Sequence, residues 1–554
     1  MIRISEIRLP LDQAADPLPA LRSAAAGILG IAESDLAEVT VFKRSFDARK
    51  AELLAVYIVD VALADPAREA ALLAQHAGRP HIGITPDMAW RPPVHAGEPL
   101  ADRPVVVGFG PCGIFAALVL AQMGLRPIVL ERGKKVRERT RDTWGLWRRR
   151  ELDPESNVQF GEGGAGTFSD GKLYSQIKDP RHLGRKVMTE FVKAGAPEEI
   201  LYVAHPHIGT FKLVKVVEHM REQIIALGGE IRFRQRLVDL LIEGAGDERR
   251  VRGLTVLDQA SGERHELRCD HAILALGHSS RDTFEKLHER GVFLEAKPFS
   301  IGFRIEHPQG LIDRARWGRH AGHPLLGAAD YKLVHHAANG RAVYSFCMCP
   351  GGTVVAATSE PGRVVTNGMS QYSRNERNAN AGMVVGIEPD RDYPGGPLAG
   401  VVLQRELESR AFVLGGENYD APGQLVGDFI AGRPSKDFGE VLPSYKPGVK
   451  LGDLQQALPE YAIGALREAL PAFGHKIKGF DRADAVLTGV ETRTSSPLRI
   501  RRGEDFQSVN VQGLYPAGEG AGYAGGILSA GVDGIKVGEA VAKNMVTRHS
   551  RTDS

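Results

Sequence analysis

The pattern of hydrophobic positions is clearest between residues 104 and 133, where it predicts a strand, a helix and a second strand. The apolar run Val105-Val106-Val107 is typical of a buried strand, and IFAALVLAQM at 114–123 has the composition of a buried helix. A second short apolar run, IVLE, ends at Glu131. Strand, helix and strand in this order predict a βαβ unit, and therefore a parallel sheet covered by helices.

The hydrophobic pattern of the first 78 residues predicts a separate small α+β domain. Strands are expected at 2–11, 38–46 and 53–63, the last two forming a hairpin around DARKAE, and helices at 21–30 and 66–76. The next segment, 79–103, is rich in proline, which argues against regular structure and predicts a linker or a strap over a neighbouring domain.

Composition and charge fit a globular enzyme better than a nucleic-acid or membrane protein. The 554 residues are 43% hydrophobic and 25% charged, with a formal net charge of +2. No apolar leader or membrane-length run is visible, and four cysteines do not make a disulfide framework. A cytoplasmic location is therefore expected, with no metal site. The basic hairpin residues Lys43, Arg44, Arg49 and Lys50 could bind RNA or an acidic partner, but a solvated hairpin face is the favoured interpretation.

The first βαβ unit carries the spacing of a dinucleotide-binding loop. Gly108 permits the tight turn after the strand, Gly110 lets the backbone approach a pyrophosphate, and Gly113 lets the helix pack on the strand. The helix N-terminus offers free N–H groups to the phosphates. Glu131, 18 residues after Gly113, is placed to accept hydrogen bonds from the adenosine ribose, and Arg132 follows it.

Three further segments bear on whether the dinucleotide is NAD or FAD. The glycine-rich stretch 158–174 can bring backbone N–H groups against a flat ring or a phosphate, and 269–280 is an apolar strand that ends in a small-residue turn. In 509–542 a strand runs into a Gly–Glu–Gly turn before a helix that starts near a second pair of glycines. The candidate cofactor-binding residues of these segments are Gly163, Gly164, Gly166, Gly277, Gly518, Glu519, Gly525, Gly526 and Ile527.

In order and spacing these segments resemble the FAD-dependent oxidoreductases of the glutathione-reductase-like superfamily. The resemblance implies non-covalent FAD, with Glu519 (often Asp in relatives) binding the ribityl chain and the last helix directed at the flavin N1–C2=O edge. The phrases SIGFRIEHPQ, SFCMCPGGTVV, TNGMSQYSRNERNAN and GVETRTSSPLRI are similar to one bacterial family of FAD-dependent dehydrogenases. That similarity implies a flavin-dependent oxidoreductase and names no substrate.

No second strand–GxGxxG–helix unit is found between 180 and 500. An NAD(P)H donor would therefore have to bind transiently, without a Rossmann unit of its own. The first glycine loop also lacks a neighbouring C-x-x-C, which disulfide reductases use for thiol chemistry.

Several residues are candidates for catalysis or substrate binding. His207 could act as an acid or base, although a structural histidine is the favoured interpretation, and Lys172 and Arg493 are the other candidate catalytic residues. Polar clusters in 366–380 and 489–500 could line a substrate cavity or an interdomain face. Their arginines would suit an anionic ligand, and they are Arg374, Arg377, Arg493 and Arg499.

Cys347 and Cys349 flank a methionine and precede Pro350-Gly351-Gly352. On a strand both thiols would face the same side and could exchange electrons with a flavin. The alternative is that both are packing residues that open a glycine turn lying near the flavin or substrate. The packing interpretation is favoured.

Together these observations predict an α/β fold with a FAD/NAD(P)-binding Rossmann-like domain, an inserted mixed α/β substrate domain and a small N-terminal α+β domain. The predicted parts are 1–78, the linker 79–103, the FAD-binding domain at 104–290 and 485–554, and the inserted domain at 291–484. The expected function is a FAD-dependent dehydrogenase or reductase that transfers hydride between a small molecule and flavin N5. A flavin monooxygenase, or a flavin-bearing sensor that uses its N-terminal domain on RNA or protein, are the alternatives. The oligomeric state is left open.

Overall fold

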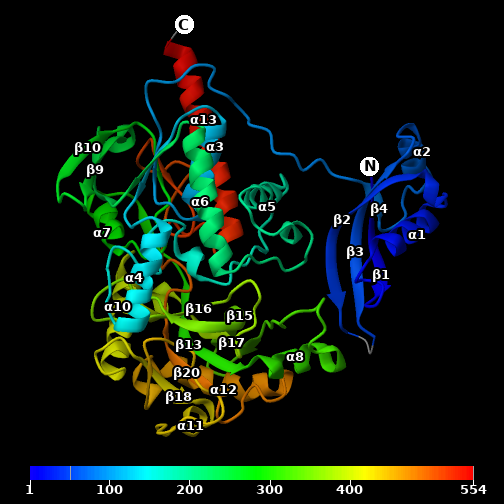
Figure 1. Ribbon diagram of the computed structural model, residues 1–554. Helices are drawn as coiled ribbons and strands as arrows, with labels where there is room; N and C mark the ends of the chain where they lie inside the picture. The colour runs from blue at the N-terminus through cyan, green and yellow to red at the C-terminus, as the bar shows by residue number, and fades with distance from the viewer. Residues whose placement is uncertain (50–51, 553–554) are drawn as a thin grey trace.

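A computed structural model of the chain describes residues 1–49 and 52–552, so Lys50 of the basic hairpin lies outside the described residues. The chain forms three parts, which Figure 1 shows as a small N-terminal unit to one side of a taller body with an upper and a lower part. Each part of the body has one large sheet. The upper sheet of the body has five strands and the lower sheet has eight.

The N-terminal unit is a four-stranded antiparallel sheet with strand order β2-β3-β1-β4 and two helices. Its elements are β1 (Ile2–Pro10), α1 (Leu18–Leu29), β2 (Leu36–Asp47), β3 (Leu54–Leu63), α2 (Ala67–Gln75) and β4 (Ile82–Ile84). The predicted hairpin and helices are present. The prediction that regular structure is absent from 79–103 is wrong at β4, because this short strand pairs with the edge of β1.

The hairpin of the N-terminal unit docks onto the body. The Arg44 N–H donates to the Tyr202 carbonyl (2.6 Å), and the Ala204 N–H donates to the Arg44 carbonyl (2.9 Å). Phe46 packs edge-on against Trp317, with ring centroids 6.4 Å apart. The interpretation of the hairpin as a solvated face is therefore wrong for Arg44, while Lys43 and Arg49 are exposed.

The upper part of the body is a parallel sheet with strand order β22-β11-β5-β6-β7. Its strands are β5 (Val105–Val107), β6 (Ile128–Glu131), β7 (Glu230–Phe233), β11 (Ala272–Leu274) and β22 (Leu514–Pro516). Helices α3 (Pro111–Gln122), α5 (Leu183–Lys193), α6 (Thr210–Ala226) and α13 (Ile527–Thr552) pack on one face. The other face is covered by β8 (Gln235–Glu243), β9 (Arg250–Asp258), β10 (Arg264–Arg268) and α7 (Arg281–Glu289).

Alternation along these strands explains the three layers. Val106 packs into the helical layer, whereas Val105 and Val107 pack into the opposite layer. Side chains of a strand alternate between its two faces. Because both faces are buried here, every residue of the strand is apolar.

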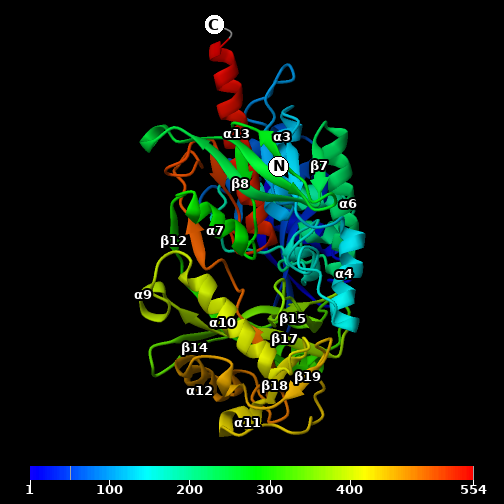
Figure 2. The ribbon, with the colours of Figure 1, turned by 90° about the vertical axis from the view of Figure 1, so that its left-hand side faces the viewer.

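The lower part is an eight-stranded sheet with order β14-β15-β17-β13-β20-β18-β19, with β16 paired to β15. Its strands are β13 (Phe299–Pro308), β14 (Val334–His336), β15 (Ala342–Ala356), β16 (Thr366–Met369), β17 (Asn378–Ile387), β18 (Ala421–Leu425), β19 (Val449–Leu451) and β20 (Val486–Glu491). The accompanying helices are α8 (Gln309–Trp317), α9 (Pro389–Asp392), α10 (Ala399–Leu414), α11 (Val426–Ala431) and α12 (Glu460–Lys476). Figure 2 shows α10, α11 and α12 at this end of the molecule.

The predicted end of the inserted domain at 484 is too early. Strand β20 lies between β13 and β18 in the eight-stranded sheet, so the insertion includes 486–491. The return to the upper part is made by β21 (Leu498–Ile500), which pairs with β12 (Leu294–Ala296). An apolar strand can join either sheet, and only the pairing decides which one.

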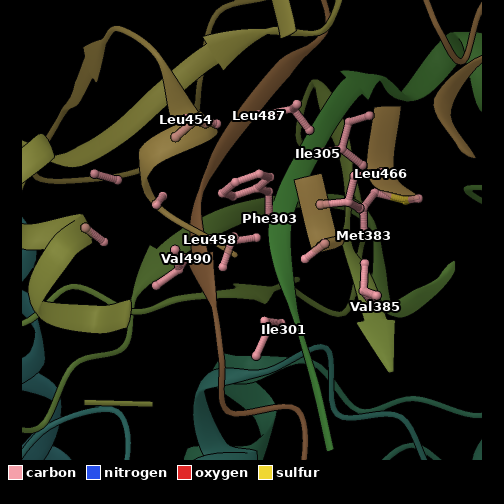
Figure 3. Close-up of a cluster of buried hydrophobic side chains, with 14 of the residues drawn as sticks. Ile301, Phe303, Ile305, Met383, Val385, Leu454, Leu458, Leu466, Leu487 and Val490 are labelled. Atoms are coloured by element: carbon pink, nitrogen blue, oxygen red, sulfur yellow. The ribbon is translucent and has the colours of Figure 1, made fainter. Parts of the chain in front are cut away.

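The core of the lower part lies between the sheet and α12. Figure 3 shows Ile301, Phe303 and Ile305 of β13 beside Met383 of β17 and Leu466 of α12. Arg304, between two of these positions on β13, lies on the opposite face of the strand. The same alternation that fills the core thus directs a buried arginine away from it.

A buried charge cluster joins the two parts of the body. Glu408 of α10 accepts hydrogen bonds from Arg281, the first residue of α7, and from Arg493, at distances of 2.7–3.0 Å. All three side chains are at most 3% exposed. Burial alone would raise the pKa of Glu408, but the two arginines outweigh burial and hold that pKa well below its usual range.

The substitution Glu408→Gln should destabilise the protein by about 3–5 kcal/mol, because it leaves the buried Arg493 without a carboxylate partner and Arg281 with Glu360 alone. Glu406→Gln on the same helix is the control. Glu406 pairs with Arg410 at the surface, and loss of an exposed pair should change the stability by less than about 1 kcal/mol. Urea unfolding of both variants measures the difference, and equal effects would contradict the proposed role of the cluster.

Candidate functional site

A cavity of about 840 Å³ lies where the parallel sheet faces the eight-stranded sheet. Residues directly after β5, β11 and β22 line it from one side, and Tyr331, Cys347, Asn367 and Glu491 line it from the other. Strands β5 and β11 are neighbours at the point where the order of the parallel sheet reverses. Ligands of such sheets bind at the carboxyl ends of the strands at this reversal.

Two glycines of the first loop are required by close backbone contacts. Gly108 has φ +101°, and a Cβ there would lie 2.1 Å from the Ala275 carbonyl oxygen. A Cβ on Gly113 would lie 1.9 Å from the Gly108 carbonyl oxygen, so α3 can approach β5 only with glycine at this position. These contacts are the physical reason for the spacing that the sequence shows.

Three other glycines face open space within the cavity. A Cβ on Gly277, Gly525 or Gly526 would meet no atom within 4 Å, although all three residues line the cavity. Helix α13 begins at Ile527, directly after Gly526, so its first N–H groups lie at the cavity wall. The bare backbone and the helix N-terminus fit a flat ligand with an electron-rich edge, such as a flavin.

The two acids assigned to the cofactor differ in their surroundings. Glu131 already accepts hydrogen bonds from the N–H groups of Phe109, Gly133 and Gly161, at 2.7–3.1 Å. Glu519 lines the cavity, and its carboxyl group accepts no hydrogen bond from any residue that the structure describes. Burial raises the pKa of Glu519 to about 8, an effect that the Lys297 ammonium opposes.

Most of the predicted cofactor residues line this one cavity. The exceptions are Gly113 and Gly163, of which Gly163 packs against Thr167 and Val217 instead. Arg132 lines the cavity but is held by Glu155 and Asp282 and stacks over Phe160. The predicted residues that line the cavity are Gly108, Gly110, Glu131, Arg132, Gly164, Gly166, Gly277, Gly518, Glu519, Gly525, Gly526 and Ile527.

The predicted catalytic residues are placed differently from one another. His207 is outside the cavity lining, its Nε2 is 2.9 Å from the Tyr372 carbonyl oxygen and its ring stacks on Tyr372, which fits the structural interpretation. Arg493 lines the cavity, but it donates to Glu408, Ser279 and Ser359. Lys172 also lines the cavity, and its Nζ donates no hydrogen bond to any residue that the structure describes.

The arginines expected to bind an anionic substrate are engaged elsewhere. Arg374 forms two hydrogen bonds with Asp170, and Arg377 donates to the carbonyls of Leu442 and Pro443. Arg499 lies 3.5 Å from Glu295. Arg493 is likewise bound to Glu408, so these four arginines provide no evidence for an anionic substrate.

A carboxyl group on the lower side of the cavity stands out. Glu491 is 3% exposed, and burial raises its pKa to about 7, an effect that Arg304 opposes. Arg304 Nε is 3.4 Å from Glu491 Oε2, and Thr366 Oγ1 donates to the same oxygen. A carboxyl group that titrates near neutral pH is suited to general acid–base chemistry.

The Cys-Met-Cys segment lies within β15, and its glycines do not form a turn at the cavity. A Cβ on Gly351 would lie 1.7 Å from the Arg374 carbonyl oxygen, and one on Gly352 would lie 2.3 Å from the Met369 carbonyl oxygen. The two glycines therefore permit close packing of the chain that follows β16. The prediction that they approach flavin or substrate is wrong, whereas Cys347 and Met348 do line the cavity.

Some lining residues carry no signal in the sequence. Gln235, Arg236 and Leu237 of β8 reach the cavity beside the first glycine loop, and Tyr331 and Lys332 reach it from the chain before β14. Their segments contain no glycine spacing or acid that marks a nucleotide site. Only the way the two sheets face each other places these residues here.

The described residues offer neither a membrane-spanning helix nor a cluster of metal ligands. Within residues 1–49 and 52–552 no helix is long and apolar enough to cross a membrane. Over the same residues, no three His, Cys, Asp or Glu side chains are grouped to hold a metal ion.

Solved structures with a related arrangement are distant. The FAD complex of glycerol-3-phosphate dehydrogenase from Bacillus halodurans is 12% identical, with a TM-score of 0.36, and the match covers 80% of this chain and 65% of that one. Quinol fumarate reductase of E. coli is 14% identical, with a TM-score of 0.37, and the match covers 81% of this chain and 71% of that one. A geranylgeranyl bacteriochlorophyll reductase-like protein of Thermoplasma acidophilum is 13% identical, with a TM-score of 0.34 and coverages of 81% and 79%. TM-scores below 0.5 carry no argument about function.

Sequence families give a firmer result. Residues 298–494 match the family "FAD-dependent protein, C-terminal domain-like", and residues 1–62 match a domain of unknown function. The first match supports FAD as the cofactor and a flavoprotein as the class. A protein of Clostridium beijerinckii, described as "uncharacterized protein", is 46% identical over 540 residues, covering 97% of this chain and 98% of its own length. The chain therefore belongs to the family of this clostridial protein, whose shared sequence includes the FAD-dependent domain.

Proposed function

We propose that the protein is a FAD-dependent oxidoreductase that holds FAD non-covalently and transfers hydride between flavin N5 and a small-molecule substrate. The observation that carries the proposal is the wall of the cavity. Gly277, Gly525 and Gly526 expose bare backbone to open space, and Glu519 presents an unpartnered carboxyl group beside them. The family match at 298–494 supports the same cofactor.

The residues of the cavity suit the parts of FAD in turn. The N-terminus of α3, after Gly110, would take the pyrophosphate, and Glu131 would accept hydrogen bonds from the adenosine ribose. Glu519 would hold the ribityl hydroxyls, and the N-terminus of α13 would face the N1–C2=O edge. Bound FAD would supply the two-electron chemistry. NAD(P)H would serve as a transiently bound electron donor.

The lower wall of the cavity would receive the substrate. Tyr331, Asn367 and Glu491 line it across from the glycines of the upper wall. Glu491 would take or give the proton that accompanies hydride transfer, since its carboxyl pKa of about 7 lets either form be present at neutral pH. Arg304 fixes the orientation of this carboxyl group from the side of β13.

The purified protein should be yellow and should carry FAD. Cofactor released by heat and separated by chromatography identifies it. Recovery of FMN or NAD at full occupancy, or of no nucleotide from protein that also fails to take up added FAD, would contradict the proposal.

Glu519→Ala should weaken FAD binding roughly 2- to 10-fold, because a carboxyl group with a pKa of about 8 is mostly uncharged at pH 7 and its hydrogen bond contributes about 0.5–1.5 kcal/mol. The FAD-free variant should be at least as stable as the wild type, since no described residue loses a hydrogen bond and a carboxyl group with a raised pKa is removed. Glu131→Ala is the contrasting variant. It leaves three buried N–H groups without an acceptor and should lower the stability of the FAD-free protein by more than about 2 kcal/mol. Titration with FAD and urea unfolding separate the two effects, and an unchanged FAD affinity in Glu519→Ala would refute its role.

Glu491→Gln should become more stable relative to the wild type as the pH rises. Because the pKa of Glu491 is raised from 4.5 to about 7, its contribution to stability is fully present below pH 4.5 and is lost as the pH rises through 7. The neutral glutamine has no such loss, so the difference between variant and wild type should grow by about 3 kcal/mol between pH 4.5 and 8. Urea unfolding of FAD-free protein measures it, with the exposed Glu504→Gln as a control that should show no trend.

A further inference from the structure

An irregularity in β15 brings Cys347 to the cavity. Phe346 pairs with Gly382 and Cys349 pairs with Asn380, so β15 has one residue more than β17 between these pairs. Cys347 has φ +44°, which fits a β-bulge. Cys347 lines the cavity, whereas Cys349 is fully buried behind it. Bulges often occur next to active sites, where they change the direction in which a side chain points.

A cation beside this segment has no full partner. Lys172 Nζ is buried and donates no hydrogen bond to any residue that the structure describes. Its nearest carboxylate, Asp170, is 3.5 Å away and already accepts two hydrogen bonds from Arg374. A buried ammonium group requires a counter-charge. Besides Asp170, Lys172 interacts electrostatically with Cys349, Cys347 and Tyr174, and with the Asp330 carboxylate.

Arg304 fixes the same segment from the other side. Its Nη1 donates to the carbonyl oxygens of Phe346 and Cys347, at 3.2 and 2.9 Å, and its Nη2 donates to Asn367 Oδ1. The guanidinium group therefore positions the bulge and adds a second positive charge near the thiols.

These surroundings shift the pKa values of the two thiols in opposite directions. A hydrogen bond from the Cys349 thiol lowers the pKa of Cys347 to about 5; burial opposes this, and Lys172 and Arg304 reinforce it. The same hydrogen bond, together with burial, raises the pKa of Cys349 well above its usual range. Cys349 Sγ also lies 3.4 Å from the Cys347 carbonyl oxygen, but an ionised sulfur is the stronger acceptor for its single proton. At neutral pH the pair is one thiolate and one thiol.

The other two cysteines show what packing alone does in this protein. Burial raises the pKa of Cys112 and raises that of Cys269 to about 12. Arg268 lowers the pKa of Cys269 and Arg502 lowers that of Cys112, but in each case burial and a neighbouring aspartate outweigh the arginine. At Cys347 the hydrogen bond from Cys349 and the two cations outweigh burial instead.

We propose that Cys347 and Cys349 form a dithiol–disulfide pair that exchanges two electrons with the flavin bound in the same cavity. This rests on the proposed function, and it replaces the packing interpretation of the two cysteines. In one direction the Cys347 thiolate and the Cys349 thiol form an S–S bond. Their two electrons and the proton of Cys349 pass to oxidised FAD, which becomes the anionic reduced flavin. In the other direction the reduced flavin returns two electrons and a proton and the S–S bond breaks.

Anaerobic dithionite titration of the FAD-loaded protein tests the proposal. The wild type and the control Cys269→Ser should take up four electrons per flavin, whereas Cys347→Ser and Cys349→Ser should each take up two. An endpoint of two electrons in the wild type would overturn the proposal. Protein without FAD would instead contradict the proposed function, so the two failures are distinguishable.

Alkylation followed by peptide mass spectrometry tests the pair without reference to activity. When the reagent is added together with denaturant, both cysteines of β15 should resist alkylation in the air-oxidised FAD-loaded protein, and after anaerobic reduction both should react. Full alkylation of both in the oxidised protein would overturn the proposal, whatever the titration endpoint.

The role of Lys172 has its own readout. In the reduced protein the thiolate absorbance in the far ultraviolet should titrate with a midpoint near pH 5, and Lys172→Met should move the midpoint upward. Cys347→Ser should abolish this titration, while Cys269→Ser should leave it unchanged. An unchanged midpoint in Lys172→Met would contradict the assignment of its charge to the thiolate.

Discussion

The buried contact between Glu408 and its two arginines determines where the cavity lies. Arg281 begins the helix that covers the back of the parallel sheet, Glu408 comes from the helix over the second sheet, and Arg493 lies on the chain that returns from one to the other. Because all three charges are buried, their ion pairs hold the two sheets together, and Arg281 pairs with Glu360 as well. The gap that remains between the sheets is the cavity.

Charges are distributed unevenly around this gap. Most buried arginines are saturated by carboxylates or carbonyls, as Arg374 is by Asp170. Three titratable groups without full partners line the cavity, namely Glu519, Glu491 and Lys172. A buried titratable group without a full partner is costly, so three such groups around one cavity indicate a site that is completed by a ligand or by a change in ionisation.

The two walls of the cavity contribute different chemistry. The upper wall is mostly backbone, since glycines and the first turns of α3 and α13 leave little side chain in the way. The lower wall carries Glu491, and the bulge of β15 adds Cys347 to it, while Glu519 belongs to the upper wall. The upper wall suits a flat cofactor held mainly by backbone groups. The lower wall suits a substrate or thiol pair that exchanges protons and electrons with that cofactor.

The sequence by itself determined the parallel sheet, the glycine loops and the residues that meet at its carboxyl edge. That was possible because a Cβ at Gly108 or Gly113 would collide with backbone, and such local constraints leave a fixed spacing along the chain. The tertiary structure alone decided that β20 belongs to the second sheet, that the candidate arginines are already paired, and that Arg44 docks on the body. It also decided that Cys347 faces the cavity, because a bulge depends on the register of the neighbouring strand. Contacts between residues that are distant in sequence produce no recognisable spacing along the chain. The residues of the lower wall could therefore be identified only from the way the two sheets pack together.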